Sequence, residues 1–528
     1  MSFKQAVNNS QSYAPSNIAK THNGANSLKS TKNPVLDLFA IAAALRGKPF
    51  NQYASTFNAA FNHDKRLTMQ LILWLRDVRE GAGERQTVRD MLVYMQDNYK
   101  QDALKMIPVL AEFGRWDDLL VFTEYECKEL AYDTIVQALK SGNALCAKWM
   151  PRLYKMKKSK TVTSTQTMPG TYAQPVKTTT AVVNMNSLSN QNRRKNNKIA
   201  YSLMTKLGMN EKEYRKLLSG LSSTVEQQMC AREWNAIEYS KVPSLASTRY
   251  LPAFMKHDET RYREFLDGLA KGTTKINASV LYPYDVMKNL VGSRYSNPTA
   301  QQVQLGIAQW DGLKNFIEDA KVLPMVDTSA SMNQYSSGDT DLTPKFMAVS
   351  LGLYIADKQK GAFKDMFLNF STKPQVFQIK GNNIAEKAFD LGNNYNGREF
   401  WDGSTNLVGA FDEVLRIAVQ NNLPAEDMPD SMIVFSDMEF NNNNSAWGTT
   451  PFKIVKSKFE QAGYNLPKVI FWNLNGRAGN NPVSSTDTGV VMVSGFSTNV
   501  LKTVLGVQIA SPEQAMMETI DVERYQVF

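Results

Sequence analysis

The chain has 528 residues, of which 43% are hydrophobic and 21% charged, so it has enough apolar side chains for folded cores and is not generally disordered. Its three cysteines, Cys127, Cys146 and Cys230, form no CxxC pair, which excludes a disulfide scaffold and a cysteine-rich zinc module. No apolar run reaches about 18 residues and no signal-peptide core is present, so we expect a soluble, reduced, cytoplasmic protein without membrane contact.

The formal net charge of +10 is unevenly distributed along the chain. Residues 1–320 contain 43 Lys and Arg against 28 Asp and Glu, whereas residues 321–528 contain 17 against 22. An excess of cations in one half suggests a polyanionic partner for that half, and nucleic acid is one candidate.

The first 320 residues predict a flexible arm followed by helices. Residues 1–33 are rich in Asn, Ser, Lys and Gln and show no periodic apolar positions, which predicts a flexible arm. Residues 34–320 repeat apolar side chains at spacings of three and four, which predicts a helical domain. We expect helices at 35–45, 67–78, 88–99, 103–113, 119–140, 196–207, 211–218 and 261–271. Such a series favours stacked antiparallel helices, as in a HEAT-like repeat.

A basic insertion interrupts this helical domain at residues 151–200. It contains ten Lys and Arg and no Asp or Glu. One interpretation is a flexible electrostatic arm that neutralises phosphates, and the alternative is a solvated, flexible loop without a specific partner. The candidate phosphate-binding residues in it are Lys155, Lys157, Lys158, Arg193, Arg194, Lys195 and Lys198.

Residues 321–528 predict an α/β domain. Short apolar segments at 321–326, 365–370, 431–435, 469–472 and 490–493 read as strands, and amphipathic segments at 343–357, 407–419 and 452–461 read as helices. Alternation of this kind predicts a Rossmann-like, mostly parallel sheet covered by helices on both faces. Ligands of such sheets bind at the carboxyl ends of the strands.

Oxygen-bearing side chains cluster at those strand ends. The first strand is followed by Asp327, Ser329 and Ser331, and the third by Asp437, while Thr405 stands in a Gly-containing loop before a helix. Five hard oxygen ligands suit Mg²⁺ and not zinc, which prefers nitrogen and sulfur. The alternative is a Ser/Asp-rich loop that holds no metal.

The order Asp-x-Ser-x-Ser, Thr, Asp resembles the metal-ion-dependent adhesion site of von Willebrand factor A domains. The resemblance implies that Asp327, Ser329, Ser331, Thr405 and Asp437 hold the metal. The three hydroxyls would be mostly direct ligands, and the two aspartates would act largely through water. An open coordination position would then accept an acidic group of a partner.

The helical half carries a second resemblance. Its motifs are LWLRDVREGAGER at 73–85, GRWDDL at 114–119, YSKVPS at 239–244, His-Asp at 257–258 followed by Arg261, and Ile-Asn at 276–277 followed by YPYD at 282–285. They resemble TROVE-module proteins, above all a branch found in plants and phages. That family includes the Ro autoantigen, which joins a ring of helical repeats to a von Willebrand A domain and binds small structured or misfolded RNAs. The resemblance spans residues 35–510 and departs from the Ro type in the basic insertion.

Four arginines of the first motif region are further candidates for RNA contact: Arg76, Arg79, Arg85 and Arg89. Guanidinium groups match phosphate geometry and often form two hydrogen bonds with it. The alternative is that they form ion pairs between packed helices.

Catalytic signals are weak. The three histidines stand far in sequence from the metal motif, and no GxSxG, Walker or HExxH pattern occurs. We therefore expect a non-catalytic RNA-binding protein, a ribonucleoprotein scaffold or RNA quality-control factor with a magnesium site. One alternative is a metal-dependent protein–protein module that grips an acidic partner residue, and a more remote one is a metal-dependent enzyme.

Overall fold

The computed structural model describes residues 17–156, 159–164, 177–182, 187–278, 280–292, 297–333, 342–396, 403–442, 449–506 and 511–528. The chain forms two compact units. We call residues 1–91 with 228–528 the split unit and residues 92–227 the inserted unit. In the described part of the chain, no helix is long and apolar enough to cross a membrane.

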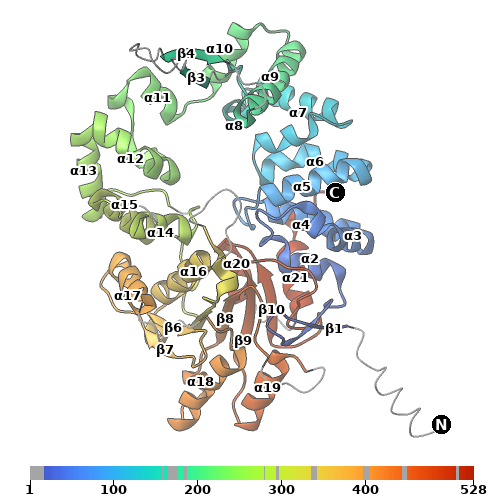
Figure 1. Ribbon diagram of the computed structural model, residues 1–528, viewed down its shortest axis with the longest axis vertical. Helices are drawn as coiled ribbons and strands as arrows, with labels where there is room; N and C mark the ends of the chain where they lie inside the picture. Colours follow the sequence, from blue (N-terminus) through green and yellow to red (C-terminus); the bar gives the residue numbers. More distant parts are fainter. Residues whose placement is uncertain are drawn as a thin grey trace, which may run out of the picture. The chain divides into compact units, whose positions relative to one another are not determined.

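A six-stranded sheet forms the centre of the split unit, in the order β10-β9-β8-β5-β6-β7. Its strands are β5 (Val322–Val326), β6 (Met366–Asn369), β7 (Val376–Gln378), β8 (Ser431–Ser436), β9 (Lys468–Asn473) and β10 (Val490–Ser494). The pairing is parallel except between β6 and β7. The carboxyl ends of five strands therefore meet at one edge, and the α/β fold expected for this half is confirmed at this level (Figure 1).

Helices pack on this sheet and extend the split unit. They are α2 (Pro34–Ala42), α3 (Ala54–His63), α4 (Lys65–Arg76), α12 (Ser244–His257), α13 (Glu259–Ala270), α14 (Pro283–Val291), α15 (Ala300–Asp311), α16 (Pro344–Lys358), α17 (Ile384–Asn396), α18 (Leu407–Gln420), α19 (Pro451–Gln461), α20 (Asn499–Gly506) and α21 (Pro512–Ile520). α16 packs on β5, while α2 and α21 pack on β10. Seven of the nine residues of α2 are buried, as expected for a helix enclosed on most sides. A helix predicted to open the helical domain thus covers the sheet.

The predicted flexible arm is corrected for residues 17–33, while residues 1–16 lie outside the described residues. Two short strands, β1 (Ile18–Lys20) and β2 (Asn26–Leu28), pair antiparallel. The Thr21 hydroxyl donates to the carbonyl of Phe440 at 2.7 Å. A polar segment can be ordered here because its partners are polar groups, such as this carbonyl and the carboxylate of Glu439, which accepts from the N–H of His22.

The inserted unit is mainly helical. It contains α6 (Lys100–Phe113), α7 (Lys128–Lys140), α8 (Ala144–Trp149), α9 (Leu188–Leu207) and α10 (Glu211–Leu221), while α5 (Gln86–Asn98) and α11 (Val225–Ala231) cross its boundaries. The single helix predicted at 119–140 is divided, because a 3₁₀ segment at Trp116–Phe122 precedes α7.

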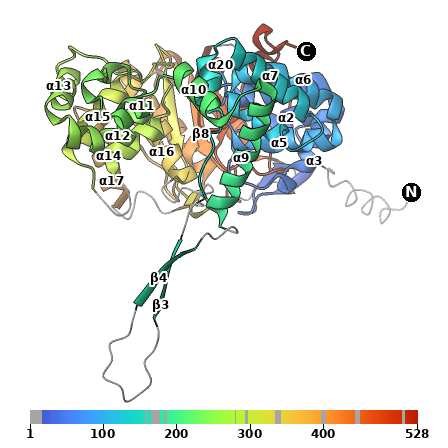
Figure 2. The same ribbon diagram turned by 90° about the horizontal axis from the view of Figure 1, so that it is seen from above.

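The basic insertion is corrected in part. β3 (Ser159–Ser164) and β4 (Lys177–Val182) form an antiparallel hairpin, seen in Figure 2. From residue 188 onward the insertion belongs to α9, whose N-cap Ser187 accepts a hydrogen bond from the N–H of Asn190. The second cluster of cations therefore lies on a 20-residue helix and not in a loop.

Candidate functional site

The turn after β5 brings together three of the candidate metal ligands. Asp327 is fully buried, and its carboxylate accepts hydrogen bonds from the N–H of Ser329 at 2.9 Å and from the hydroxyl of Ser436 at 2.6 Å. The hydroxyl oxygens of Ser329 and Ser331 lie 3.0 Å apart. One carboxylate and two hydroxyls thus share one turn at the sheet edge.

Asp437 adds a second buried carboxylate at this edge. It follows β8, the direct neighbour of β5, and is 1% exposed. Burial raises the pKa of Asp437, an effect that the neighbouring Ser331 hydroxyl opposes. Burial, followed by the negative charge of Asp437, raises the pKa of Asp327. Two buried carboxylates that repel each other in this way are costly unless a cation compensates them.

Thr405 is attached to the same loop from a third segment. Its carbonyl accepts a hydrogen bond from the N–H of Asn441 at 3.1 Å, four residues beyond Asp437. Among the described residues, Oγ1 of Thr405 and Oδ2 of Asp437 are buried and have no hydrogen-bond partner. Because buried polar atoms are almost always satisfied, two such oxygens at one sheet edge fit the coordination shell of a cation.

The chemistry of the donors fits Mg²⁺. Two carboxylates and three hydroxyls provide hard oxygen only, and a divalent ion would balance the charges of Asp327 and Asp437 while leaving coordination positions for water or an anion. In the residues that the structure describes, no group of three or more His, Cys, Asp and Glu offers an alternative metal cluster.

The four candidate arginines of the first motif region differ in accessibility. Arg76 is 1% exposed, so the structure contradicts its prediction as an RNA contact. Arg79 and Arg85 are exposed, and Arg89 is half-buried. The sequence could not separate them, because the spacing of arginines along a chain does not show which of them the folded chain buries.

Acidic residues of this motif hold distant segments together. Asp77 accepts hydrogen bonds from Nε of Arg524 at 2.6 Å and from the hydroxyl of Tyr525 at 3.1 Å. Glu84 accepts two from the guanidinium of Arg46, at 2.7 and 3.2 Å. These two motif residues therefore stabilise the split unit.

The second cluster of cations in the basic insertion lies on α9. Arg194, Lys195 and Lys198 are exposed, and Tyr201 follows Lys198 by about one turn with 56% of its surface exposed. These four side chains line a hollow of about 740 Å³. We call them the α9 face.

The remaining candidates of the insertion lie beside this helix or outside the described residues. Arg193 is half-buried, donates to the carbonyl of Lys155 at 2.5 Å and lies 5.7 Å from the ring centre of Tyr154. Lys155 itself is exposed. Lys157 and Lys158 lie outside the described residues.

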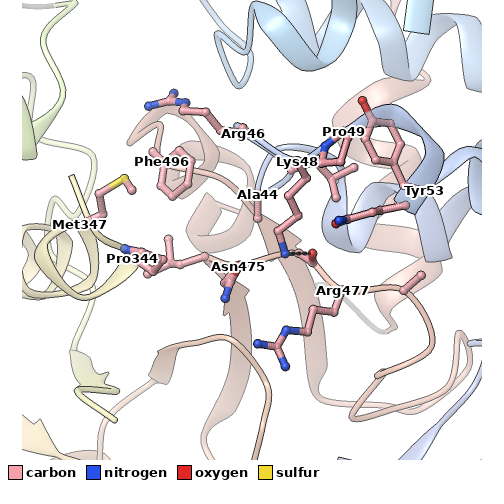
Figure 3. A pocket seen from close by; sticks show the side chains of 16 residues that line it. Ala44, Arg46, Lys48, Pro49, Tyr53, Pro344, Met347, Asn475, Arg477 and Phe496 are labelled. Atoms are coloured by element: carbon pink, nitrogen blue, oxygen red, sulfur yellow. Dashed lines mark hydrogen bonds between the residues drawn. The ribbon is translucent and has the colours of Figure 1, made fainter. Parts of the chain in front are cut away.

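Sequence reasoning missed a pocket of about 490 Å³ in the split unit. It is lined by Arg46, Lys48 and Arg477 among others, and Figure 3 shows these side chains together with Asn475 and Phe496. Four parts of the chain form it, at 44–53, at 344–347, at 474–478 and at Phe496, so no local motif could indicate it.

Comparison with known proteins gives two family matches that meet at residues 321 and 322. A family described as Domain of unknown function (DUF2828) matches residues 21–125 and 121–322, which is more than half of the chain. The chain belongs to this family. A second model, Domain of unknown function (DUF7788), matches residues 321–526.

Two individual proteins can be aligned with this DUF2828 member over most of its length. An uncharacterized protein of Acanthamoeba polyphaga mimivirus is 28% identical over 563 aligned positions, covering 96% of this chain and 87% of that protein. The crystal structure of the Ro (RSR) protein of Deinococcus radiodurans covers 93% of this chain and all of that chain, with 13% identity and a TM-score of 0.46. A score of this size does not establish a shared fold.

The DUF2828 segment and the α/β segment both contribute to the pocket around Lys48. Arg46 and Lys48 come from the DUF2828 match, whereas Asn475 and Arg477 come from the second match. All five candidate metal ligands, in contrast, lie in the second match.

Proposed function

We propose that this DUF2828 protein is a non-catalytic RNA-binding protein that acts as a ribonucleoprotein scaffold or RNA quality-control factor. The observation that supports RNA binding best is the α9 face, where three cations and an exposed aromatic ring share one side of a helix. Small structured or misfolded RNA is the proposed ligand class, and the cytoplasm the proposed location.

The charge distribution supports this choice of surface. The inserted unit contains 20 Lys and Arg against 12 Asp and Glu, a net charge of +8 within a chain of +10. Only Lys195 of the three α9 cations has an ion-pair partner among the described residues, Glu124 at 2.7 Å, and both side chains are nearly half exposed. Such exposed pairs are weak, so a phosphate can replace the carboxylate.

The proposed contact combines two physical effects. Lys and Arg at the phosphates release counterions, which gives an affinity that falls with salt by a slope of about 0.7–0.9 per contact. Tyr201 offers a face on which an unpaired base can stack, worth about 1–3 kcal/mol. Together they favour RNA with accessible single-stranded positions.

A filter-binding titration with a mixed RNA pool at about 150 mM salt tests the proposal. The variant Arg194→Gln, Lys195→Gln, Lys198→Gln should weaken binding and flatten the salt slope by about 2–3. The matched control replaces three exposed cations of α10, also in the inserted unit: Lys212, Arg215 and Lys216. Equal losses in both variants would mean that net charge, and not the α9 face, attracts the RNA.

A second candidate function rests on the two unpartnered oxygens of Thr405 and Asp437. We propose that the strand-end residues form a magnesium site like that of von Willebrand A domains, with a coordination position for an acidic group of a partner. Calorimetric titration of Mg²⁺ into the parent and into Asp327→Ala tests the site. Asp412→Asn is the control, because this carboxylate is 43% exposed and pairs with Lys458. Undiminished Mg²⁺ binding by Asp327→Ala would refute the assignment.

A further inference from the structure

The 490 Å³ pocket is built by close approach of backbone segments. α2 ends at Ala42, and the turn that follows contains Arg46 and Lys48. The Gly476 N–H donates to the carbonyl of Ala44 at 3.1 Å, and a Cβ at Gly476 would lie 2.7 Å from the carbonyl oxygen of Ile41. Glycine therefore permits the loop after β9 to approach the end of α2.

The polar lining consists mainly of hydrogen-bond donors. Arg46 is neutralised by Glu84 and lies 4.6 Å from the ring centre of Phe496. Arg477 makes a single 2.9 Å contact with Glu439. Among the described residues that line the pocket there is no Asp or Glu, and it contains none of the candidate metal ligands.

Lys48 has no carboxylate partner in the described part of the chain. Its ammonium group donates to the carbonyl of Gly476 at 2.5 Å, shown by the dashed line in Figure 3. Burial, followed by the nearby charge of Arg477, lowers its pKa to about 8, although Asp437 and Glu439 act in the opposite direction. In this environment the charged form of Lys48 would be stabilised by an anion placed beside it.

Asn475 provides an independent indication of a ligand. It is 5% exposed, and its amide Nδ2 has no hydrogen-bond partner among the described residues. The 15-residue helix α16 also begins at the pocket, with Pro344 and Met347 in the lining. A helix N-terminus has partial positive charge, so it adds to the preference for an anion.

The pocket is larger and more apolar than a bare inorganic anion would require. About 490 Å³ falls in the range of small-molecule sites. Beside the donors, the lining contains Pro49, Tyr53, Pro344, Met347 and Phe496. The ligand must therefore join an anionic group to a compact organic group.

We propose that this pocket binds a small organic phosphate, a phosphomonoester carried by a group the size of a nucleoside. A phosphomonoester has a charge of about −1.5 to −2 at pH 7 and three strong acceptor oxygens, which match the donors of Lys48, Arg477 and Asn475. The proposal goes beyond RNA binding on the α9 face, because the pocket belongs wholly to the split unit.

Calorimetric titration of 5′-AMP into the full chain in EDTA tests the proposal without involving the magnesium site. We expect saturable 1:1 binding that Lys48→Gln weakens about tenfold or more, since a charge-assisted hydrogen bond is lost. The control Lys502→Gln removes an exposed lysine from α20 and should leave the affinity unchanged. Adenosine should bind far more weakly than 5′-AMP.

A second variant guards against misfolding of the first. Arg477→Gln changes a side chain that is 32% exposed, so its fold should survive, and it should also weaken 5′-AMP. Absence of 5′-AMP binding to the parent, equal affinity for adenosine, or full affinity in both variants would overturn the proposal.

Two sources of the phosphomonoester can be distinguished in the same experiment. A 5′-phosphorylated trinucleotide that binds more tightly than 5′-AMP would identify an RNA end, and the reverse order would identify a free nucleotide. The α9 triple variant should bind 5′-AMP like the parent, so failure of RNA binding and failure of this pocket give different results.

Discussion

Two ion pairs connect the α4 region with the C-terminal segment, but they differ in burial. Nε of Arg524 lies 2.6 Å from Asp77, which is fully buried. Arg66 lies 2.6 Å from Asp521, yet its side chain is 53% exposed. We predict that Arg524→Ala destabilises the split unit much more than Arg66→Ala.

The magnitudes follow from what each substitution leaves behind. Without Arg524 the Asp77 carboxylate stays buried and loses its cation, a change that typically costs about 3–5 kcal/mol. The Tyr525 hydroxyl at 3.1 Å and the Arg79 N–H at 2.9 Å still donate to it, so we expect about 2–4 kcal/mol. The exposed Arg66 pair contributes about 0.2–1 kcal/mol.

Urea unfolding combined with hydrogen exchange measures the difference. A chain with two units need not unfold in one step, so the readout must be local. The amides of α4 should lose protection in Arg524→Ala at urea concentrations where Arg66→Ala and the parent keep it. Similar losses of amide protection in the two variants would refute the reasoning, because they would show that burial of Asp77 does not strengthen its ion pair with Arg524.

Three further predictions concern the sites. If the proposed site binds Mg²⁺, a hundredfold excess over Kd should raise the free energy of unfolding of the parent by about 2.7 kcal/mol, and Asp327→Asn should abolish this gain. In EDTA, calorimetry should show the variant more stable than the parent, because one of two mutually repelling buried carboxylates is gone. Affinity for 5′-AMP should decrease as the pH rises through about 8, since Lys48 then loses its proton, and calorimetry on Lys48→Gln should show no such step. Gly476→Ala should cost about 1–3 kcal/mol through the contact with Ile41, whereas Gly220→Ala, with nothing within 4 Å of the new Cβ, should be neutral or stabilising in urea unfolding.

Five of the six strands of the sheet could be predicted because each is a short apolar run that is mostly buried, whereas the short β7, with no buried residue, was missed. β5 and β8 were placed correctly, and with them the strand ends that carry Asp327 and Asp437. The apolar spacing of α2 also predicts a helix, but such spacing does not show which other element the helix packs on. Its packing on β10 depends on residues more than 400 positions away.

Polar segments and pockets were harder to predict for a related reason. Residues 17–33 have no apolar pattern, and their order comes from hydrogen bonds such as that of Thr21 with Phe440. Arg76 and Arg79 look alike in sequence, yet one is buried and the other exposed. The pocket at Lys48 requires four distant parts of the chain, so only the folded chain reveals it.

The packing of α2 on β10 has a consequence for synthesis of the chain. The Ser494 hydroxyl donates to the carbonyl of Phe39, a separation of 455 residues. At roughly 5–20 residues per second, a ribosome needs on the order of 20–90 s to make the intervening polypeptide. During that time the apolar surface of α2 cannot pack on β10. We therefore expect the nascent chain to depend on a chaperone until its last strand leaves the ribosome.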